Sequence, residues 1–186
     1  DTERCHPRFS NLILADLDRL GLHWDGNIRY QSQHLDTYHA LLDEKLKALS
    51  YGCDCSRKSL QTYQLAHPNT QYTYPRICVH KRLSRDHAIR LVMPDNPMLF
   101  FDQLQGVISG NPQREQGDIV VRRRRIGRSF SNTPTASKGM INYMLAVVID
   151  DVQQSVNQIV RGLDILPLTI PQMVIADYLN FPPNQH

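Results

Sequence analysis

Residues 142–151 read Asn-Tyr-Met-Leu-Ala-Val-Val-Ile-Asp-Asp, and residues 159–162 read Ile-Val-Arg-Gly. The apolar run 144–149 contains several β-branched residues, which is typical of a strand buried on both faces of a parallel sheet. Such a strand delivers Asp150 and Asp151 to the carboxyl edge of the sheet, where open α/β folds bind ligands. Tyr143 adds a hydroxyl, and Arg161 adds a planar guanidinium suited to a carboxylate. The stretch predicts an α/β fold with a ligand site; the plainer alternative is a core strand, a surface arginine and a turn glycine.

The composition is that of an ordinary globular protein. The chain has 186 residues, of which 41% are hydrophobic and 21% charged, enough for one domain with a core and a small insert. It has no apolar run of 18 residues and no visible signal peptide, so we expect a cytoplasmic protein with no membrane partner. A net charge of +3 permits nucleic-acid binding without arguing for it. The four arginines at 122–125 are more often a solvated face than a site. We expect a monomer.

Periodicity and turn residues predict the remaining elements. Helices are expected over 9–20, 35–49, 57–65 and 169–179, and strands over 88–93, 99–104 and 118–121. Residues 53–117 are interpreted as a mixed α/β insert between two parts of one main domain, 1–52 and 118–186. Residues 126–139, rich in Ser, Thr, Gly and basic residues, are interpreted as a flexible loop.

Three cysteines form a candidate metal site. Cys53 and Cys55 are one residue apart and Cys78 lies further on, so three thiolates are available to a tetrahedral zinc ion. The candidates for a fourth ligand are Tyr74, His80 and His67. Physical chemistry alone favours a histidine, because a phenol has a pKa near ~10 and must lose its proton to bind well. The alternative is a set of reduced thiols that hold no metal.

The quoted motifs resemble a known enzyme family. Tyr-x-Leu-Ala-Val-Val-x-Asp-Asp followed by Ile-Val-Arg-Gly-x-Asp is similar to the catalytic domain of the glutamyl-tRNA synthetase superfamily, the class I synthetases for glutamate and glutamine. Further matches are Gly-Leu-His-Trp-Asp-Gly at 21–26, Gln-Ser-Gln at 31–33, and Asp1 with Arg4 in an Asp-x-x-Arg pattern. The resemblance covers nearly the whole chain and is closest to a small branch, the glutamyl-Q tRNA(Asp) synthetases.

This resemblance implies a Rossmann-like class I catalytic domain with a zinc-bearing insert, and it implies roles for particular residues. The family's Cys-x-Cys and Tyr-x-x-x-Cys zinc ligands match Cys53, Cys55, Tyr74 and Cys78, with His80 as the fallback for the tyrosine. The family's glutamate-binding residues match Tyr143 and Arg161. Asp150 and Asp151 match the family's paired acids. Two roles are equally open for them: a contact near the tRNA end or the adenylate, or a helix N-terminal cap. No residue is assigned to the bond-making steps.

The reaction implied by the resemblance has two steps. With Mg²⁺, the carboxylate of glutamate attacks the α-phosphorus of ATP, and the glutamyl group of the resulting adenylate then passes to tRNA. The leading hypothesis is a bacterial enzyme that attaches glutamate to the queuosine base of tRNA(Asp). The alternatives are part of an ordinary glutamyl-tRNA synthetase that charges tRNA(Glu), and a non-catalytic zinc-stapled RNA-binding module. Neither nucleotide motif of the family, His-x-Gly-His-like or Lys-Met-Ser-Lys-like, has a match in 1–186. We therefore expect activity from a longer parent and not from these residues alone.

Overall fold

A computed structural model describes residues 6–68, 73–124 and 139–184 of the chain. The chain divides into two units, Asp1–Leu35 and Asp36–His186, and each is treated by itself. The family matches at Asp1 and Arg4 lie outside the described residues, as does nearly all of the predicted loop 126–139.

The first unit contains the predicted helix 9–20, observed as α1 (Pro7–Arg19). His6 caps it by accepting a hydrogen bond at Nδ1 from the Arg8 backbone N–H, at 3.2 Å. The helix stops before Gly21, whose φ of 70° is a left-handed conformation favourable to glycine. A short 3₁₀ helix, η1 (Gln31–Gln33), follows in the Gln-Ser-Gln motif.

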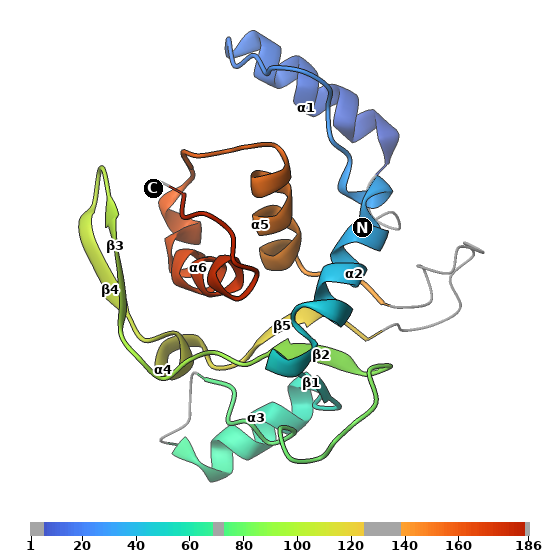
Figure 1. The fold of residues 1–186 in the computed structure, drawn as a ribbon, viewed down its shortest axis with the longest axis vertical. Helices are drawn as coiled ribbons and strands as arrows, with labels where there is room; N and C mark the ends of the chain where they lie inside the picture. The colour runs from blue at the N-terminus through green and yellow to red at the C-terminus, as the bar shows by residue number, and fades with distance from the viewer. Residues whose placement is uncertain (1–5, 69–72, 125–138, 185–186) are drawn as a thin grey trace. The chain divides into compact units, whose positions relative to one another are not determined.

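The second unit is built on a three-stranded antiparallel sheet (Figure 1). Its strands, in the order β1-β2-β5, are β1 (Ser50–Cys53), β2 (Ala88–Leu91) and β5 (Ile119–Arg122). The central strand is almost wholly buried, because it has a neighbour on both sides and helices nearby. The strands predicted at 88–93 and 118–121 are thus confirmed. The largest fully buried apolar side chains of the unit include Tyr38, Leu42, Leu46, Ile89, Leu91, Leu145 and Ile149.

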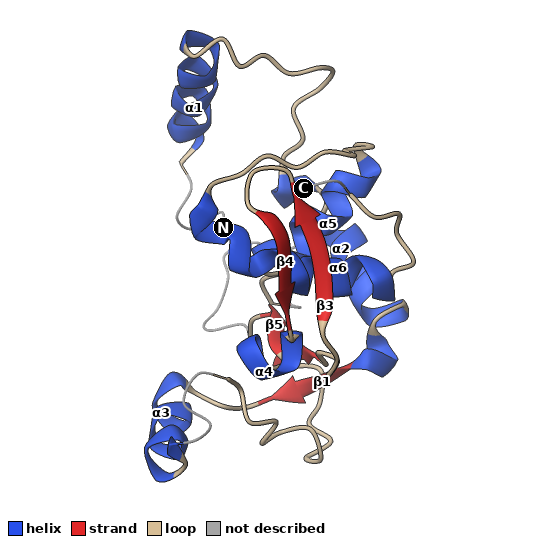
Figure 2. Ribbon diagram, turned by 90° about the vertical axis from the view of Figure 1, so that its left-hand side faces the viewer, coloured by secondary structure: helices blue, strands red, loops and turns tan. Residues whose placement is uncertain are grey.

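A second, two-stranded sheet is the hairpin of β3 (Met98–Asp102) and β4 (Gly106–Gly110), the long red pair in Figure 2. Strand β3 corresponds to the strand predicted at 99–104. Its side chains alternate as the pleat requires, with Phe100 buried and Leu99 and Phe101 exposed. The hairpin turn, between Asp102 and Gly106, borders the cavity described below.

The remaining short helices are α2 (Leu35–Glu44), η2 (Lys47–Leu49), α3 (Arg57–Ala66), α4 (Pro112–Gln116), η5 (Leu163–Leu168) and α6 (Thr169–Tyr178). Of these, α2 with η2, α3 and α6 lie near predicted positions, and α4 and η5 were not predicted. A reciprocal capping box between Ser56 and Ser59 begins α3. The helix predicted over 35–49 ends earlier than expected, at Glu44, and continues after a break as η2. No helix among the described residues is both long and apolar enough to cross a membrane.

The prediction of a strand at 144–149 is wrong. These residues lie in helix α5 (Tyr143–Gln153), which Asn142 caps by accepting a hydrogen bond from the Met144 N–H at 3.4 Å. The run lacks polar alternation because α5 is buried on most sides, packed against α6 (Figure 1). Tertiary burial therefore outweighs the strand preference of its β-branched residues. Strand pairs formed by the described residues are all antiparallel, so the parallel sheet expected around this run is not formed by them.

Candidate functional site

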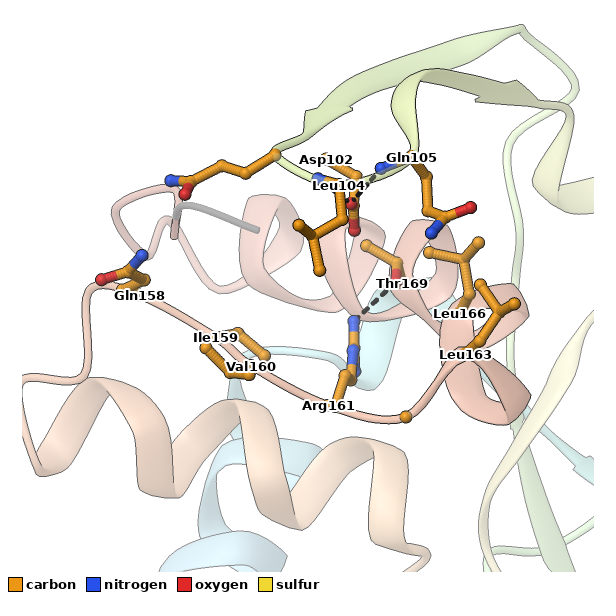
Figure 3. Close-up of a pocket in the computed structure, with 12 residues that line it drawn as sticks. Asp102, Leu104, Gln105, Gln158, Ile159, Val160, Arg161, Leu163, Leu166 and Thr169 are labelled. Atoms are coloured by element: carbon orange, nitrogen blue, oxygen red, sulfur yellow. Dashed lines mark hydrogen bonds between the residues drawn. The ribbon is translucent and has the colours of Figure 1, made fainter.

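Arg161 borders a cavity of about 340 Å³ in the second unit. The walls come from the β3–β4 turn, the extended segment 158–162 and the beginning of α6. Figure 3 shows the Arg161 side chain reaching from this segment toward Thr169, below the hairpin turn that carries Asp102 and Gln105. Asp102 shapes that turn, since its Oδ1 accepts hydrogen bonds from the backbone N–H groups of Leu104 and Gln105, both at 2.8 Å.

The Arg161 guanidinium is held in place by α6. Its Nη2 donates to Thr169 Oγ1 at 2.6 Å, and its Nη1 donates to Gln172 Oε1. These bonds fix the plane of a group that has five N–H donors, so further donors remain for a ligand. Burial lowers the pKa of Arg161, while the nearby Tyr143, Asp151 and Asp102 act to raise it. The result is a cation oriented in advance, the arrangement that favours recognition of a carboxylate.

Gln172 has a buried nitrogen that the described residues leave without a partner. Its side-chain oxygen is taken by Arg161, and its Nε2 has no hydrogen-bond acceptor among them. The residue also lines a second cavity of about 410 Å³, together with Asp151. A buried amide N–H needs an acceptor, so Gln172 marks this region as a place for a polar ligand or for another part of the protein.

Tyr143, the other residue predicted to bind glutamate, is the first residue of α5 and is 48% exposed. It is close enough to Arg161 to contribute to the pKa of that residue, but it is not among the residues lining the Arg161 cavity. The structure therefore places the predicted pair in one region, with Arg161 in the cavity and Tyr143 outside its lining.

The paired acids have different surroundings. Asp150 is buried and accepts a hydrogen bond at Oδ1 from the hydroxyl of Tyr38 in α2, at 2.6 Å. Asp151 is partly buried and lines the second cavity. Burial and the neighbouring Asp150 raise the pKa of Asp151, and Arg161 lowers it. Both acids lie in the last turns of α5, so the interpretation that they cap a helix N-terminus is wrong.

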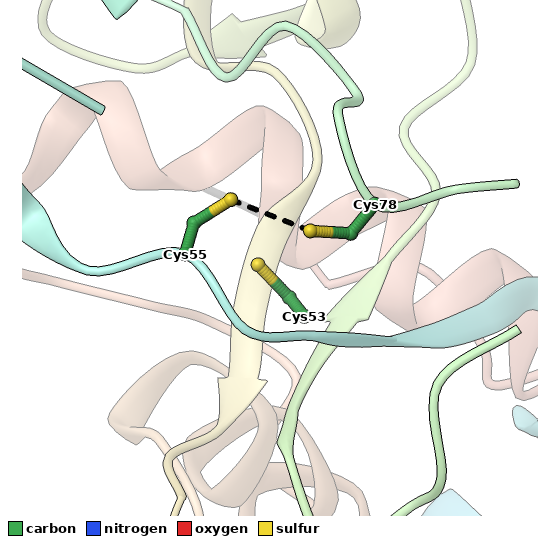
Figure 4. Close-up of side chains that lie close together, drawn as sticks. All are labelled: Cys53, Cys55 and Cys78. Carbon is green, nitrogen blue, oxygen red and sulfur yellow. Dashed lines mark hydrogen bonds between the residues drawn. The ribbon is translucent and has the colours of Figure 1, made fainter. Parts of the chain in front are cut away.

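The predicted cysteines converge at the end of β1, as Figure 4 shows. The sulfur atoms of Cys53, Cys55 and Cys78 all lie within 4.8 Å of one another. The shortest separation recorded is 3.3 Å, between Cys55 and Cys78. Cys53 and Cys78 are buried and Cys55 is partly exposed. Three thiols at this spacing form a donor set that suits a soft or borderline metal ion.

Tyr74 completes the cluster. Its hydroxyl oxygen lies 3.4 Å from the Cys53 sulfur and 3.7 Å from the Cys55 sulfur, and it accepts a hydrogen bond from the Cys78 N–H at 3.2 Å. His80 is exposed, and no histidine belongs to the metal-ligand cluster found among the described residues. The geometry therefore favours the tyrosine over His80 as the fourth donor.

The pKa values of the side chains in this cluster are shifted in different directions. Burial and a hydrogen bond with Cys78 raise the pKa of Cys55 to about 12. Burial likewise raises the pKa of Tyr74. Burial also acts to raise the pKa of Cys53, but hydrogen bonds with Tyr74 and Arg90 outweigh it and the pKa is lowered. Cys53 therefore ionises more readily than Cys55.

Two residues beside the cysteines were missed at the sequence level. Arg90, in the centre of β2, is 9% exposed and donates from Nε to the Cys53 sulfur at 3.2 Å. Asp118 is fully buried and accepts from Arg76, from the Tyr51 hydroxyl at 2.6 Å and from the Met93 N–H at 2.9 Å. The signal that was available for Arg90 is its charge inside a segment predicted to be a strand, because buried charges are rarely unpaired.

The family model for the catalytic domain of class I tRNA synthetases, E and Q, matches residues 1–186. The chain belongs to this family. Its α/β class I catalytic domain, predicted from the motifs, is thereby confirmed, and Arg161 and the cysteine cluster lie in a synthetase domain.

Relatives within this family carry a more specific name. The chain is 38% identical over 183 residues to a glutamyl-Q tRNA(Asp) synthetase of Pseudomonas putida, covering 97% of this chain and 54% of that protein. It is 35% identical over 180 residues to the Pseudomonas aeruginosa protein of the same name, covering 96% and 55%. The chain thus spans about half the length of the curated relatives it matches.

Solved structures support the fold at lower identity. A glutamate tRNA ligase from Elizabethkingia meningosepticum superposes with a TM-score of 0.71 at 20% identity, covering 100% of this chain and 40% of that one. The glutamate-tRNA synthetase of Elizabethkingia anophelis gives a TM-score of 0.73 with the same identity and coverage. At this identity the likeness concerns the architecture of the domain.

Proposed function

We propose that the chain is part of a glutamyl-Q tRNA(Asp) synthetase, which activates glutamate with ATP and Mg²⁺ and transfers it to the queuosine base of tRNA(Asp). The observation that carries this proposal is the 38% identity to a glutamyl-Q tRNA(Asp) synthetase over 97% of the chain. The convergence of three cysteines with Tyr74, as the motif of that branch requires, supports it independently of overall identity. The proposed action on tRNA also implies a cytoplasmic location.

In the proposed reaction Arg161 binds a carboxylate of glutamate. Its guanidinium is fixed by Thr169 and Gln172 and borders a cavity, so it is already oriented when the amino acid arrives. A fixed cation also discriminates against glutamine, whose neutral amide would leave the guanidinium without a charge partner. We propose that Tyr143 supplies a second contact from the start of α5, and that Asp151, whose carboxylate is influenced by Arg161, helps to orient the amino acid, the adenylate or the tRNA end.

A structural zinc ion is the second part of the proposal, with Cys53, Cys55, Tyr74 and Cys78 as ligands. The donor set fits zinc, because three sulfurs and one phenol oxygen lie within a few ångströms of one another. Four protein ligands leave no open position for water, so the ion would stabilise the fold and would not act on substrate. We propose further that 53–117 is the zinc-bearing insert between 1–52 and 118–186, and that the longer parent completes a Rossmann-like sheet.

Two other functions remain as outcomes of the test. The solved neighbours are glutamate-tRNA ligases, but an ordinary enzyme of that kind is a less good match than the glutamyl-Q branch. A non-catalytic zinc-stapled RNA-binding module would bind tRNA with a steep dependence on salt and would release no pyrophosphate.

The experiment is a charging assay on the whole protein that contains this chain. Labelled glutamate, ATP and Mg²⁺ are supplied with queuosine-containing tRNA(Asp), and in parallel with tRNA(Glu). The proposal predicts pyrophosphate release and label on tRNA(Asp) alone. Label on tRNA(Glu) would identify an ordinary synthetase, and tRNA binding without pyrophosphate release would identify the RNA-binding module.

A further inference from the structure

Arg90 contacts two residues of the cysteine–tyrosine cluster, the sulfur atom of Cys53 and the aromatic ring of Tyr74. Its Nε donates to the Cys53 sulfur at 3.2 Å, and its guanidinium carbon lies 3.5 Å from the centre of the Tyr74 ring. The same side chain donates from Nη1 to the backbone carbonyl of Asp118 on the neighbouring strand. One planar cation is therefore fixed at three points, two of which are proposed zinc ligands.

The charge of the cluster explains why a cation belongs there. Zinc binds cysteine as thiolate, so three thiolates around Zn²⁺ carry a net negative charge, which grows if the phenol ionises. Cys53 and Cys78 are buried, and a buried charge without compensation is strongly unfavourable. Lys81 lies on the exposed side and is paired with Asp54 at 2.9 Å. Among the residues that the structure describes, Arg90 is the buried cation that touches the cluster.

The position of Arg90 over the Tyr74 ring has a second consequence. A guanidinium over an aromatic face is attracted to it and restricts its orientation. The Cys78 N–H meanwhile donates to the hydroxyl oxygen of the same ring. Together these contacts point the phenol oxygen toward the sulfurs, although free tyrosine is a poor zinc ligand.

We propose that Arg90 is a positioning residue of the metal site, which holds the Tyr74 ring and the Cys53 sulfur and balances the negative charge of the metal-loaded cluster. The inference rests on the proposed zinc ligands and adds a residue to them. Partners of metal ligands typically change affinity by about 10- to 100-fold when removed. A purely structural arginine, which served only to join β2 to Asp118, would change stability and leave metal affinity alone.

The test compares Arg90→Met with Arg122→Met in the whole protein. Arg122 is also a buried arginine, 3% exposed against 9% for Arg90, and it lies on the adjacent strand β5, where it donates to the Arg85 carbonyl and pairs with Asp43. Zinc affinity is measured by competition with a chromophoric chelator, and folding by circular dichroism. We expect Arg90→Met to weaken zinc binding by about 10- to 100-fold, and Arg122→Met to lower stability without changing zinc affinity.

Arg90→Lys keeps the charge and loses the planar group, so it separates the two roles and covers the case in which Arg90→Met does not fold. We expect an intermediate zinc affinity, and a visible spectrum of the Co²⁺-substituted protein that differs from the parent because the Tyr74 oxygen is no longer held. Parent-like affinity and spectra in the folded Arg90 variants would overturn the inference and leave the zinc site standing. A parent that binds no zinc would overturn both.

Discussion

The buried hydrogen bond between Tyr38 and Asp150 leads to a quantitative prediction. The two residues are 112 positions apart, the Tyr38 hydroxyl lies 2.6 Å from Asp150 Oδ1, and both side chains are buried. Tyr38→Phe removes the donor while keeping the ring, so the core packing stays intact and the change isolates the hydroxyl. Its effect decides whether Asp150 serves to fix α5 against α2.

The size of the effect follows from the hydrogen bond that is lost. Hydrogen bonds to carboxylates contribute about 1.5–3 kcal/mol to stability. We therefore expect Tyr38→Phe to lower the free energy of unfolding by about 2 kcal/mol. For a domain of this size each kcal/mol shifts the melting temperature by roughly 2–4 °C, so we expect a fall of about 4–8 °C.

The assay is urea denaturation of the parent, Tyr38→Phe, Asp150→Asn and the double variant. The double-mutant cycle isolates the pair, and we expect a coupling of at least about 1 kcal/mol. Tyr143→Phe is the matched control, since Tyr143 is half-exposed and its loss should change stability by less than about 0.5 kcal/mol. A Tyr38→Phe effect no larger than that of the control would refute the structural role and favour a ligand contact for Asp150.

Three further predictions concern the two candidate sites. Arg161→Ala should abolish glutamate-dependent pyrophosphate release while leaving the protein folded and its zinc content near that of the parent, although the buried Thr169 and Gln172 lose their partner and the melting temperature falls. Arg161→Lys should restore little because it lacks the planar fork; normal activity in the alanine variant would remove Arg161 from the site. Cys78→Ser should reduce bound zinc, measured by atomic emission, and lower thermal stability before it affects glutamate affinity, whereas full zinc occupancy would refute the ligand assignment. Gly117→Ala should destabilise the protein by about 2 kcal/mol or more, because at φ 65° its Cβ would lie 2.5 Å from the Tyr74 backbone nitrogen. Gly106→Ala is the control, because Gly106 also has a positive φ but an added Cβ there would have no atom within 4 Å. It should lower stability only by the backbone strain of about 1–2 kcal/mol. Equal denaturation midpoints for the two glycine variants would contradict the close approach of Gly117 to Tyr74.

The residues of α5 show that one sequence alone does not always distinguish a helix from a strand. The run 144–149 is apolar on all sides, and a fully buried helix and a fully buried strand look alike in such a pattern. The sequence signal for a helix is Asn142, a good N-cap residue directly before the run. Helices α1 and α6 are predictable because their apolar residues recur at helical spacing.

The candidate sites were predictable to different depths. Local motifs led to Cys53, Cys55 and Cys78, which the structure brings together. The family pattern led to Tyr74 where chemistry alone favoured a histidine. The contacts of Arg90 could not be predicted, because they join β2 to Cys53 and Tyr74, which are 37 and 16 positions away. Contacts between residues this far apart produce no periodic pattern in a single sequence.

The most direct test of the proposed function is to map where the glutamyl group is attached. Queuosine-containing tRNA(Asp) is charged with labelled glutamate by the whole protein and cut with a base-specific ribonuclease, and the fragments are separated. We expect label on the anticodon fragment and none on the 3′-terminal fragment. Label at the 3′ end would contradict it, because the enzyme would then charge the terminal adenosine as an ordinary synthetase does.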